Sequence, residues 1–473
     1  MPYTRNGCHE HFLYLQNCIS VNLEEKQKME GDGGTRNQEM HTAYLPIEVV
    51  DLILTEAARG DVVTTFILPF VCQQWKERKS IWSPPRFIPP ELEVEHRHRI
   101  RVRVSEEAAK RGHLRVLKWL KAIGWPIDAR TFYEAAAGGH LDVLKWLNDY
   151  KFPGMLNNIP TTKAAANGHF EVLKWLREAG CSWDAEICSS AAQSGHLHIL
   201  KWARENGCKW NANTTSYAAE GGHLEVLKWA RENKCSWNST ACSFAARNGH
   251  LEVLKWLREQ GCTWNAQTCS KAAEGGHLDV LKLLRENEPP CPWNHITLVE
   301  AATNGHLEVL KWAVEQGCLK NDSRVCQMAA QGGHVAIIQW MIDEQGFSLK
   351  EEGLCHHAAM GGQYETLKWL RERGGWWDAT TTSFAAQGGH FEMLKWAKEQ
   401  GCPLGVDCCA YAASKGRIGI LRWLRDQNCP WNEETTFMAA YSGYEEVFKY
   451  AVTHGCPVSA ESERIIKLTF VHT

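Results

Sequence analysis

Histidine and cysteine, which often bind metal ions or act as acids, bases and nucleophiles, recur regularly along this 473-residue chain. The histidines follow a glycine about every 27 residues, at His113, His140, His169, His196, His223, His250, His277, His306, His334 and His390. Cysteines repeat in two series, Cys181, Cys208, Cys235 and Cys262, and Cys188, Cys242, Cys269 and Cys326. Such ladders of imidazoles and thiols suggest a metal site or a proton relay.

The spacing of the two ladders argues against that chemistry. Successive rungs on packed helices lie about 10 Å apart, whereas the ligands of one Zn²⁺ each lie about 2.0–2.1 Å from the ion. Cysteines with Cα atoms more than about 7 Å apart cannot form disulfides along a ladder. We therefore interpret each histidine as a partner of the adjacent turn and each cysteine as a small buried hydrophobe, with Cys262 and Cys269 close within one repeat.

No metal, cofactor or enzymatic activity is expected. No Ser-His-Asp grouping, phosphate-binding loop or carboxylate pair stands out from the repeat, and the Gly-Gly pairs are explained by helix turns. The chain carries a formal charge of -3 with 23% charged residues, so composition indicates no general affinity for nucleic acid or an anionic membrane. The cysteine-rich sequence without a signal peptide predicts reduced thiols and a cytoplasmic or nuclear location.

The ladders belong to one repeated unit, of which GHLEVLKWLREQGCTWN, residues 249–265, is typical. Its glycine recurs at Gly112, Gly139, Gly168, Gly195, Gly222, Gly249, Gly276, Gly305, Gly333, Gly362, Gly389, Gly416 and Gly443. These thirteen copies fill residues 104–457, and a period in this range is typical of a solenoid. Residues 458–473 form a tail that finishes a polar C-terminal cap, and a monomer is expected.

One repeat, residues 265–291, shows how the chain folds. Asn265 caps a short helix whose packed face carries Ala272 and Ala273, and Gly276 ends that helix with a positive φ. A second helix follows with a wide leucine stripe, and in most copies a tryptophan replaces Leu283. The predicted fold is all-α, a stack of helix pairs in which small alanines face leucine and tryptophan.

The signature Ala-Ala-x-x-Gly-His-Leu-x-Val-Leu-Lys, with Gly-Cys closing the second helix, resembles the ankyrin repeat. The family's unit is about 33 residues, whereas this one is mostly 27. The missing residues fall where an ankyrin β-hairpin would stand, so the hairpin is expected to be reduced to a tight turn. That turn holds Trp183, Trp210, Trp237, Trp264, Trp293 and Trp431. The resemblance implies binding to other proteins and a concave face lined by the first helices.

The residue directly before each Ala-Ala pair varies between copies, so the repeat does not dictate it. We call these positions the concave column; the predicted protein-binding members are Tyr217, Phe244, Lys271, Glu300, Met328, His357, Phe384 and Tyr411. Tyr217 with Phe244, and Phe384 with Tyr411, are predicted to form two aromatic patches suited to binding hot spots. The position after the pair would form a polar rim. The alternative is that the aromatic residues only pack against the neighbouring repeat.

The N-terminal region differs from the repeats. Residues 1–40 are polar and predicted to be disordered. Residues 44–78 predict a small helical module that resembles an F-box, through Leu45, Pro46, Val49, Leu52, Val71 and Trp75. The resemblance implies docking to the adaptor subunit of a cullin–RING ubiquitin ligase, which makes the chain a substrate-recruiting adaptor. Its middle is longer than usual, and Pro69 falls inside the last expected helix.

Two alternatives apply to this region. Residues 44–78 could instead cap the apolar end of the stack, which leaves a plain binding scaffold. Residues 79–103 form a proline-rich and then basic linker, in which Arg97, Arg99, Arg101 and Arg103 offer a nuclear signal or a contact to phosphate. A solvated linker is the commoner outcome for such a stretch, and neither nucleic acid nor a membrane is expected as a partner.

Overall fold

The computed structural model describes residues 103–122, 124–318, 323–349 and 353–469. Every regular element within these ranges is a helix, which confirms the all-α prediction and the helix-pair solenoid. The predicted disordered N-terminus, the F-box-like module and all of the linker except Arg103 lie outside the described residues.

The chain divides into two units, and the first consists of residues 1–218 and 225–235. A helix over residues 103–110 opens its described part. The labelled helices that follow are α5 (Leu114–Ala122), α6 (Ala129–Gly138), α7 (Leu141–Asn148), α8 (Ile159–Ala166), α9 (Phe170–Glu178), α10 (Ala185–Gln193), α11 (Leu197–Glu205), and most of α12 (Ala212–Glu220) and α13 (Leu224–Glu232).

The second unit consists of residues 219–224 and 236–473. Its N-terminal helices are α14 (Ser239–Arg247), α15 (Leu251–Glu259), α16 (Ala266–Gly275), α17 (Leu278–Glu286), α18 (His295–Thr303), α19 (Leu307–Glu315), α20 (Ser323–Gly332) and α21 (Val335–Gln345). They are followed by α22 (Leu354–Met360), α23 (Tyr364–Glu372), α24 (Ala379–Gly388), α25 (Phe391–Glu399), α26 (Asp407–Ser414), α27 (Ile418–Asp426), α28 (Glu433–Tyr441), α29 (Glu445–Thr453) and α30 (Ala460–Thr469).

Local sequence signals set the ends of the first helices. The Asn265 side chain accepts a hydrogen bond from the backbone N–H of Gln267 at 3.0 Å, and Thr268 completes a capping box. Gly276, at φ 76°, ends α16 in the left-handed conformation that favours glycine. Asn265 and Gly276 were predicted to act in this way, and the structure confirms both.

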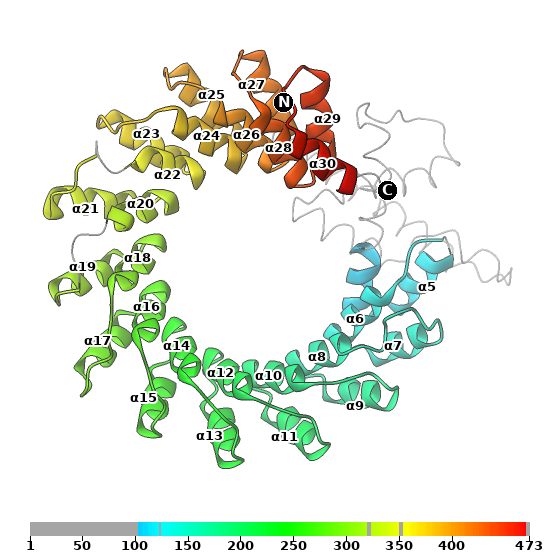
Figure 1. Cartoon of the computed structure of the whole chain (residues 1–473). Helices are drawn as coiled ribbons and strands as arrows, with labels where there is room; N and C mark the ends of the chain where they lie inside the picture. The colour runs from blue at the N-terminus through cyan, green and yellow to red at the C-terminus, as the bar shows by residue number, and fades with distance from the viewer. Residues whose placement is uncertain (1–102, 123, 319–322, 350–352, 470–473) are drawn as a thin grey trace, which may run out of the picture. The chain divides into compact units, whose positions relative to one another are not determined.

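Each unit has two layers, one of first helices (even numbers) and one of second helices (odd numbers), as Figure 1 shows. Neighbouring first helices pack closely because their Ala-Ala pairs, such as Ala272 and Ala273, are fully buried and leave little side chain between the backbones. Neighbouring second helices make far fewer contacts. Within each unit the first helices therefore lie on the inner side of the bend.

The turns between repeats hold tryptophans in place of a hairpin. Trp237 meets Trp256 edge to face, with ring centroids 5.8 Å apart. The guanidinium of Arg258 lies 4.4 Å from the ring centroid of Trp264. The described turns contain no strand. The shortened repeat thus stabilises its turns by aromatic and cation–π contacts rather than by a β-ladder.

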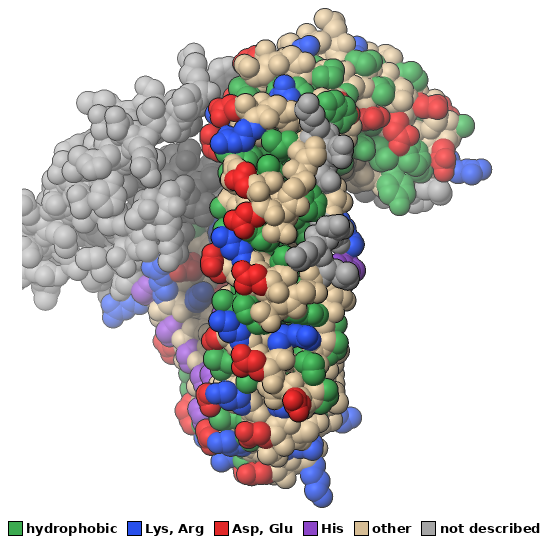
Figure 2. All heavy atoms as spheres, turned by 90° about the vertical axis from the view of Figure 1, so that its left-hand side faces the viewer, with side chains coloured by type: hydrophobic (Ala, Val, Ile, Leu, Met, Phe, Trp, Pro, Cys, Tyr) green, Lys and Arg blue, Asp and Glu red, His purple; other side chains and the backbone are tan. Residues whose placement is uncertain are grey.

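On the face that Figure 2 presents, acidic and basic side chains are interspersed, and neither sign forms a separate patch. Opposite charges also pair along second helices of the second unit. Lys255 and Glu252 lie 2.9 Å apart in an i,i+3 pair on α15, and Lys395 and Glu392 repeat it on α25 at 3.0 Å. Each exposed pair contributes only a few tenths of a kcal/mol. This face therefore offers a solvated surface of balanced charge.

The cysteine ladder connects consecutive turns. The Cys262 thiol donates to the carbonyl oxygen of Asn238 at 3.5 Å, and the Cys291 thiol to that of Asn265 at 3.2 Å. All cysteines in the described ranges are buried, free thiols, as the sequence predicted. The expected neighbour of Cys262 was Cys269, but its thiol partner is Cys242 on α14, the first helix of the pair whose second helix Cys262 closes. The two thiols lie near opposite ends of one repeat in sequence, and they meet because the second helix of the pair runs back along the first.

The histidine ladder also joins neighbouring repeats. His250 Nε2 lies 2.9 Å from the carbonyl oxygen of Glu220, and His306 Nε2 lies 3.0 Å from that of Glu274. An Nε2 that carries a proton donates to this carbonyl, which lies at the end of the first helix of the preceding repeat. The prediction of a hydrogen bond to a turn was right in kind, but it was wrong in placing the bond at the start of the histidine's own helix, where no side-chain cap forms.

Each of these imidazoles lies directly against the glycine of the preceding repeat. A Cβ atom added to Gly276 would lie 2.5 Å from Nδ1 of His306. Where histidine is replaced, another flat or flexible side chain takes its place: Gln363 lies against Gly333, and Tyr444 against Gly416. The repeat glycine therefore has two functions, a positive φ and room for the next imidazole.

We expect Gly276→Ala to destabilise the second unit by about 1–2 kcal/mol more than Gly261→Ala. Both glycines have a positive φ, 76° and 80°, so both variants incur the cost of a left-handed alanine. A Cβ on Gly261 meets nothing within 4 Å, whereas one on Gly276 collides with His306. The difference in unfolding free energy, measured by urea denaturation, isolates the overpacking term. Equal losses in the two variants would show that the imidazole yields without cost.

Candidate protein-binding face

The concave column lies along the first helices, one residue from each. Tyr217 is on α12, Phe244 on α14, Lys271 on α16, Glu300 on α18, Met328 on α20, His357 on α22, Phe384 on α24 and Tyr411 on α26. All eight are half-buried, whereas the alanines that follow them are fully buried. The column therefore sits at the edge of the packed interface, where one side of each residue meets the stack and the other meets solvent.

The described part of the first unit contributes charges to this face. Lys163 on α8 and Glu134 on α6, two column positions in successive repeats, form an ion pair of 2.9 Å. Because both groups are partly exposed, the pair stabilises the stack only weakly. Column residues thus contact their neighbours in the next repeat and still reach solvent.

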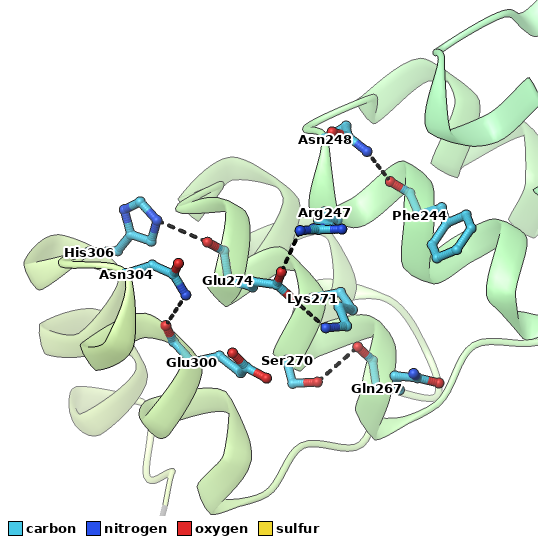
Figure 3. A network of polar contacts seen from close by, with 10 residues as sticks. All are labelled: Phe244, Arg247, Asn248, Gln267, Ser270, Lys271, Glu274, Glu300, Asn304 and His306. Carbon is cyan, nitrogen blue, oxygen red and sulfur yellow. Dashed lines mark hydrogen bonds and ion pairs between the residues drawn. The ribbon is translucent and has the colours of Figure 1, made fainter. Parts of the chain in front are cut away.

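A polar network occupies the N-terminal part of the second unit's face, shown in Figure 3. Glu274 is its centre: Arg247 Nη2 lies 2.8 Å from Glu274 Oε1, and Lys271 binds the other carboxylate oxygen. The Glu274 side chain is only 16% exposed. Two cations surrounding one partly desolvated carboxylate restrain three long side chains, so this part of the face is ordered before any partner arrives.

Helix ends on the same face are closed by asparagine side chains. Asn248 Nδ2 donates to the carbonyl oxygen of Phe244 at 3.1 Å, and Asn304 Nδ2 to that of Glu300 at 2.9 Å (Figure 3). Each of these carbonyls also accepts from the backbone N–H of the same asparagine, so the side chain adds a second bond at the last turn of the helix. The backbone beside Phe244 and Glu300 is therefore fixed, and the column residues are held at defined positions.

An aromatic cluster occupies the C-terminal part of the second unit's face. The rings of Phe384 and Tyr411 lie 5.7 Å apart, and His356 lies 5.9 Å from Phe384. His356 in turn contacts His357 at 4.9 Å. Burial, and next the neighbouring His357, lower the pKa of His356 below its ordinary value, so the neutral imidazole is favoured here.

The predicted patch of Phe384 and Tyr411 is thus brought together within one unit. The other predicted pair is divided, because Tyr217 belongs to the first unit and Phe244 to the second. That patch remains a prediction. Both interpretations of the aromatic residues hold in part for Phe384: its ring packs against the next repeat and is still half exposed.

Sequence reasoning missed three residues of this face. Met360 and Tyr441 follow the alanine pair of α22 and α28, a position that had been assigned to a polar rim, and Tyr441 is 72% exposed. His356 precedes His357 and joins the aromatic cluster. The sequence could have indicated Met360 and Tyr441, because the position after each alanine pair lies three residues beyond the concave column and therefore on the same side of its helix.

The F-box-like residues Leu45, Pro46, Val49, Leu52, Val71 and Trp75 lie outside the described residues. Within the described part of the chain, no helix is long and apolar enough to cross a membrane. Over the same ranges, no three His, Cys, Asp or Glu side chains are placed to hold a metal ion.

Three segments of the chain match family models of ankyrin repeats. Residues 189–268 and 298–383 match a model described as ankyrin repeats in three copies. Residues 106–147 match a model described as ankyrin repeats in many copies. These segments are therefore ankyrin repeats, as the signature predicted.

Solved structures similar to part of this chain were found, whereas no curated relative was. The crystal structure of the human ASB11 ankyrin repeat domain is similar to part of this chain at 22% identity, with a TM-score of 0.28. The similarity covers 34% of this chain and 84% of that one. No curated protein matches the chain.

Proposed function

We propose that this chain of ankyrin repeats is a scaffold that holds a target protein on its concave column and delivers it to a ubiquitin ligase through residues 44–78. Ankyrin repeats support the general role of a protein-binding scaffold. The observation that carries the choice of surface is the half exposure of every column residue beside fully buried alanines.

The histidines and cysteines that suggested a reactive or metal-binding site instead form hydrogen bonds that hold the stack together. Histidines such as His250 and His306 bond to the preceding repeat, and cysteines such as Cys262 and Cys291 bond to the preceding turn. Those side chains repeat because the packing repeats. The column differs from copy to copy because the repeat does not fix which residue stands there, so selection for a partner would act there.

The ligase branch of the proposal depends on residues 44–78. Leu45, Pro46 and Trp75 match the ends of an F-box, and a target-binding repeat array joined to such a module would recruit substrates. The alternative is a plain scaffold in which this segment covers the first repeat. The two differ in what happens when its first residues are changed.

We expect the double variant Leu45→Ala and Pro46→Ala to lose copurification with the F-box-binding adaptor subunit, by at least tenfold. In the resemblance these two residues begin the helix that contacts the adaptor, and losing an apolar anchor at an interface costs about 2 kcal/mol or more. The measurement is a pull-down of purified adaptor with the full chain. The matched control changes Ile88→Ala and Pro89→Ala in the linker.

Failure of this test has a distinct signature for each alternative. If residues 44–78 only cap the stack, the wild-type chain retains no adaptor, and the double variant lowers the midpoint of thermal unfolding instead. If the linker control loses the adaptor equally, the contact is not made by the F-box-like residues. Either result would refute the proposed contact through residues 44–78, and the first would leave only the scaffold.

A further inference from the structure

The first-helix face of the second unit changes character between α18 and α20. On α14, α16 and α18 every alanine pair has at least one charged neighbour: Arg247 beside Phe244 on α14, Lys271 and Glu274 on α16, and Glu300 with Thr303 on α18. On α20, α22, α24, α26 and α28 the position before the pair is uncharged throughout. It holds Met328, His357, Phe384, Tyr411 and Met438.

The position after the pair is also uncharged on these five helices. It holds Gln331, Met360, Gln387, Ser414 and Tyr441. Residues before and after a pair are spaced i,i+3, so they lie on one side of the helix. Adjacent first helices from α20 to α28 pack in sequence, which makes these ten positions one surface, called here the uncharged strip.

Charged residues on these helices are restricted to the ends. Arg324 is in the first turn of α20, Asp407 and Glu433 begin α26 and α28, and Lys415 follows α26. The uncharged strip is thus bordered by charge but contains none. An interface with an apolar centre and a polar rim has this arrangement, and its centre is typically rich in aromatic residues and methionine.

The uncharged strip is also partly preorganised. The ring of Phe384 contacts those of His356 and Tyr411, and Phe437 stacks on Tyr441 with centroids 5.8 Å apart and planes at 21°. Tyr441 is nonetheless 72% exposed. Rings already held by neighbours lose little conformational entropy on binding, while Met328, Met360 and Met438 are flexible enough to adapt to a partner's shape.

We infer that the uncharged strip binds an uncharged, apolar segment of the target protein, one whose contacting side chains are aliphatic or aromatic. This inference rests on the proposed scaffold function and narrows it. A charged side chain placed over the strip would lose hydration and find no opposite charge there. The polar network around Glu274 lies outside the footprint and would face a different, polar part of the same target.

The test selects ligands from a random 15-residue peptide library displayed on phage, with the full chain as bait. We expect the selected peptides to be rich in Leu, Ile, Phe and Trp, with no charged residue at the positions they share. Phe384→Ala and Tyr411→Ala should each weaken binding of a synthetic copy at least tenfold. Lys271→Ala, in the polar network, should change its Kd less than threefold, and raising NaCl from 50 to 500 mM should have as little effect.

A second variant protects the test against loss of folding. Gln387→Lys introduces a charge on the uncharged strip without removing a ring, and it should weaken the same peptides at least tenfold. Urea unfolding of each variant checks that the second unit is intact.

Three outcomes would overturn the inference. Charge-rich peptides whose binding is lost with Lys271→Ala and spared by Phe384→Ala would retain the scaffold and refute the uncharged strip. Failure to select any peptide sensitive to either variant would count against both the strip and the proposed face. Concentration-dependent dimers in sedimentation, abolished by Tyr441→Ser, would show that a second copy of the chain occupies the strip instead.

Discussion

Leu281→Ala should cost the second unit about 2–5 kcal/mol of unfolding free energy, the usual range for truncating a buried leucine. Leu281 is on α17, where it is fully buried between the two layers. Its removal leaves a cavity in a layer that includes small alanines and has no larger side chain ready to fill it. The loss is measured by urea denaturation monitored by tryptophan fluorescence.

The same variant should also change how the array unfolds. Each repeat is stabilised mainly by its immediate neighbours, so weakening one interior repeat uncouples the repeats on either side. We expect the unfolding transition to broaden or split into two. Lys282→Ala, one residue along and exposed, is the matched control and should stay within about 0.5 kcal/mol of the parent. Equal behaviour of the two variants would refute the packing assigned to α17.

The local architecture could be predicted from sequence because its signals lie within one repeat. Asn265 caps the first helix, Ala272 and Ala273 allow close approach, and Gly276 ends the helix. The cap and the helix stop act on residues no more than four positions away, and the alanine pair marks the packed face within the same copy, so a single copy contains the evidence. Repetition in register then extended the conclusion along the whole array.

Contacts between repeats could not be predicted in the same way. His306 bonds to Glu274, 32 residues earlier, and His250 bonds to Glu220, 30 residues earlier. Both partners depend on how far one helix pair is rotated and shifted against the next. The period of the sequence fixes which columns meet, but the offset between rungs comes from side-chain packing.

The sequence predicted the concave column, but it did not predict that the face divides into a polar region and an uncharged region. The position before each alanine pair was identified because it varies, and the structure places it at the edge of the packed layer. The position after the pair was expected to be polar throughout, since Arg247 and Glu274 represent it well. Met360 and Tyr441 break that pattern, and only the packing of α20 to α28 shows that they adjoin Phe384 and Tyr411.

The cysteines that the sequence marked as buried hydrophobes lead to a prediction about alkaline pH. Burial raises the pKa of the Cys181, Cys235 and Cys456 thiols from 9.0 to about 11, and of Cys355 and Cys402 to about 12. A thiol whose folded pKa is raised ionises first in the unfolded chain. Its contribution to stability is therefore complete below pH 9 and is lost as pH rises toward the folded value.

We expect the unfolding free energy to fall steeply between pH 9 and pH 11. Each such thiol lowers the unfolding free energy by about 1.4 kcal/mol per pH unit in this range. Five of them together lower it by several kcal/mol, which is on the scale of the whole stability of a folded domain. Urea denaturation at a series of pH values, with reductant present, measures the slope. Cys402→Ala should reduce that slope by about one proton, while Lys282→Ala should leave it unchanged.

This slope separates the structural role of the cysteines from a chemical one. A thiol used as a nucleophile or redox sensor needs a lowered pKa and access to solvent. Cys402 has the opposite, since it is 1% exposed and donates to the carbonyl oxygen of Asp378 at 3.2 Å. Stability that stays constant from pH 8 to pH 10.5 would mean that these thiols ionise as readily in the stack as in the unfolded chain, and the cysteine ladder would then have to be reconsidered as a reactive feature.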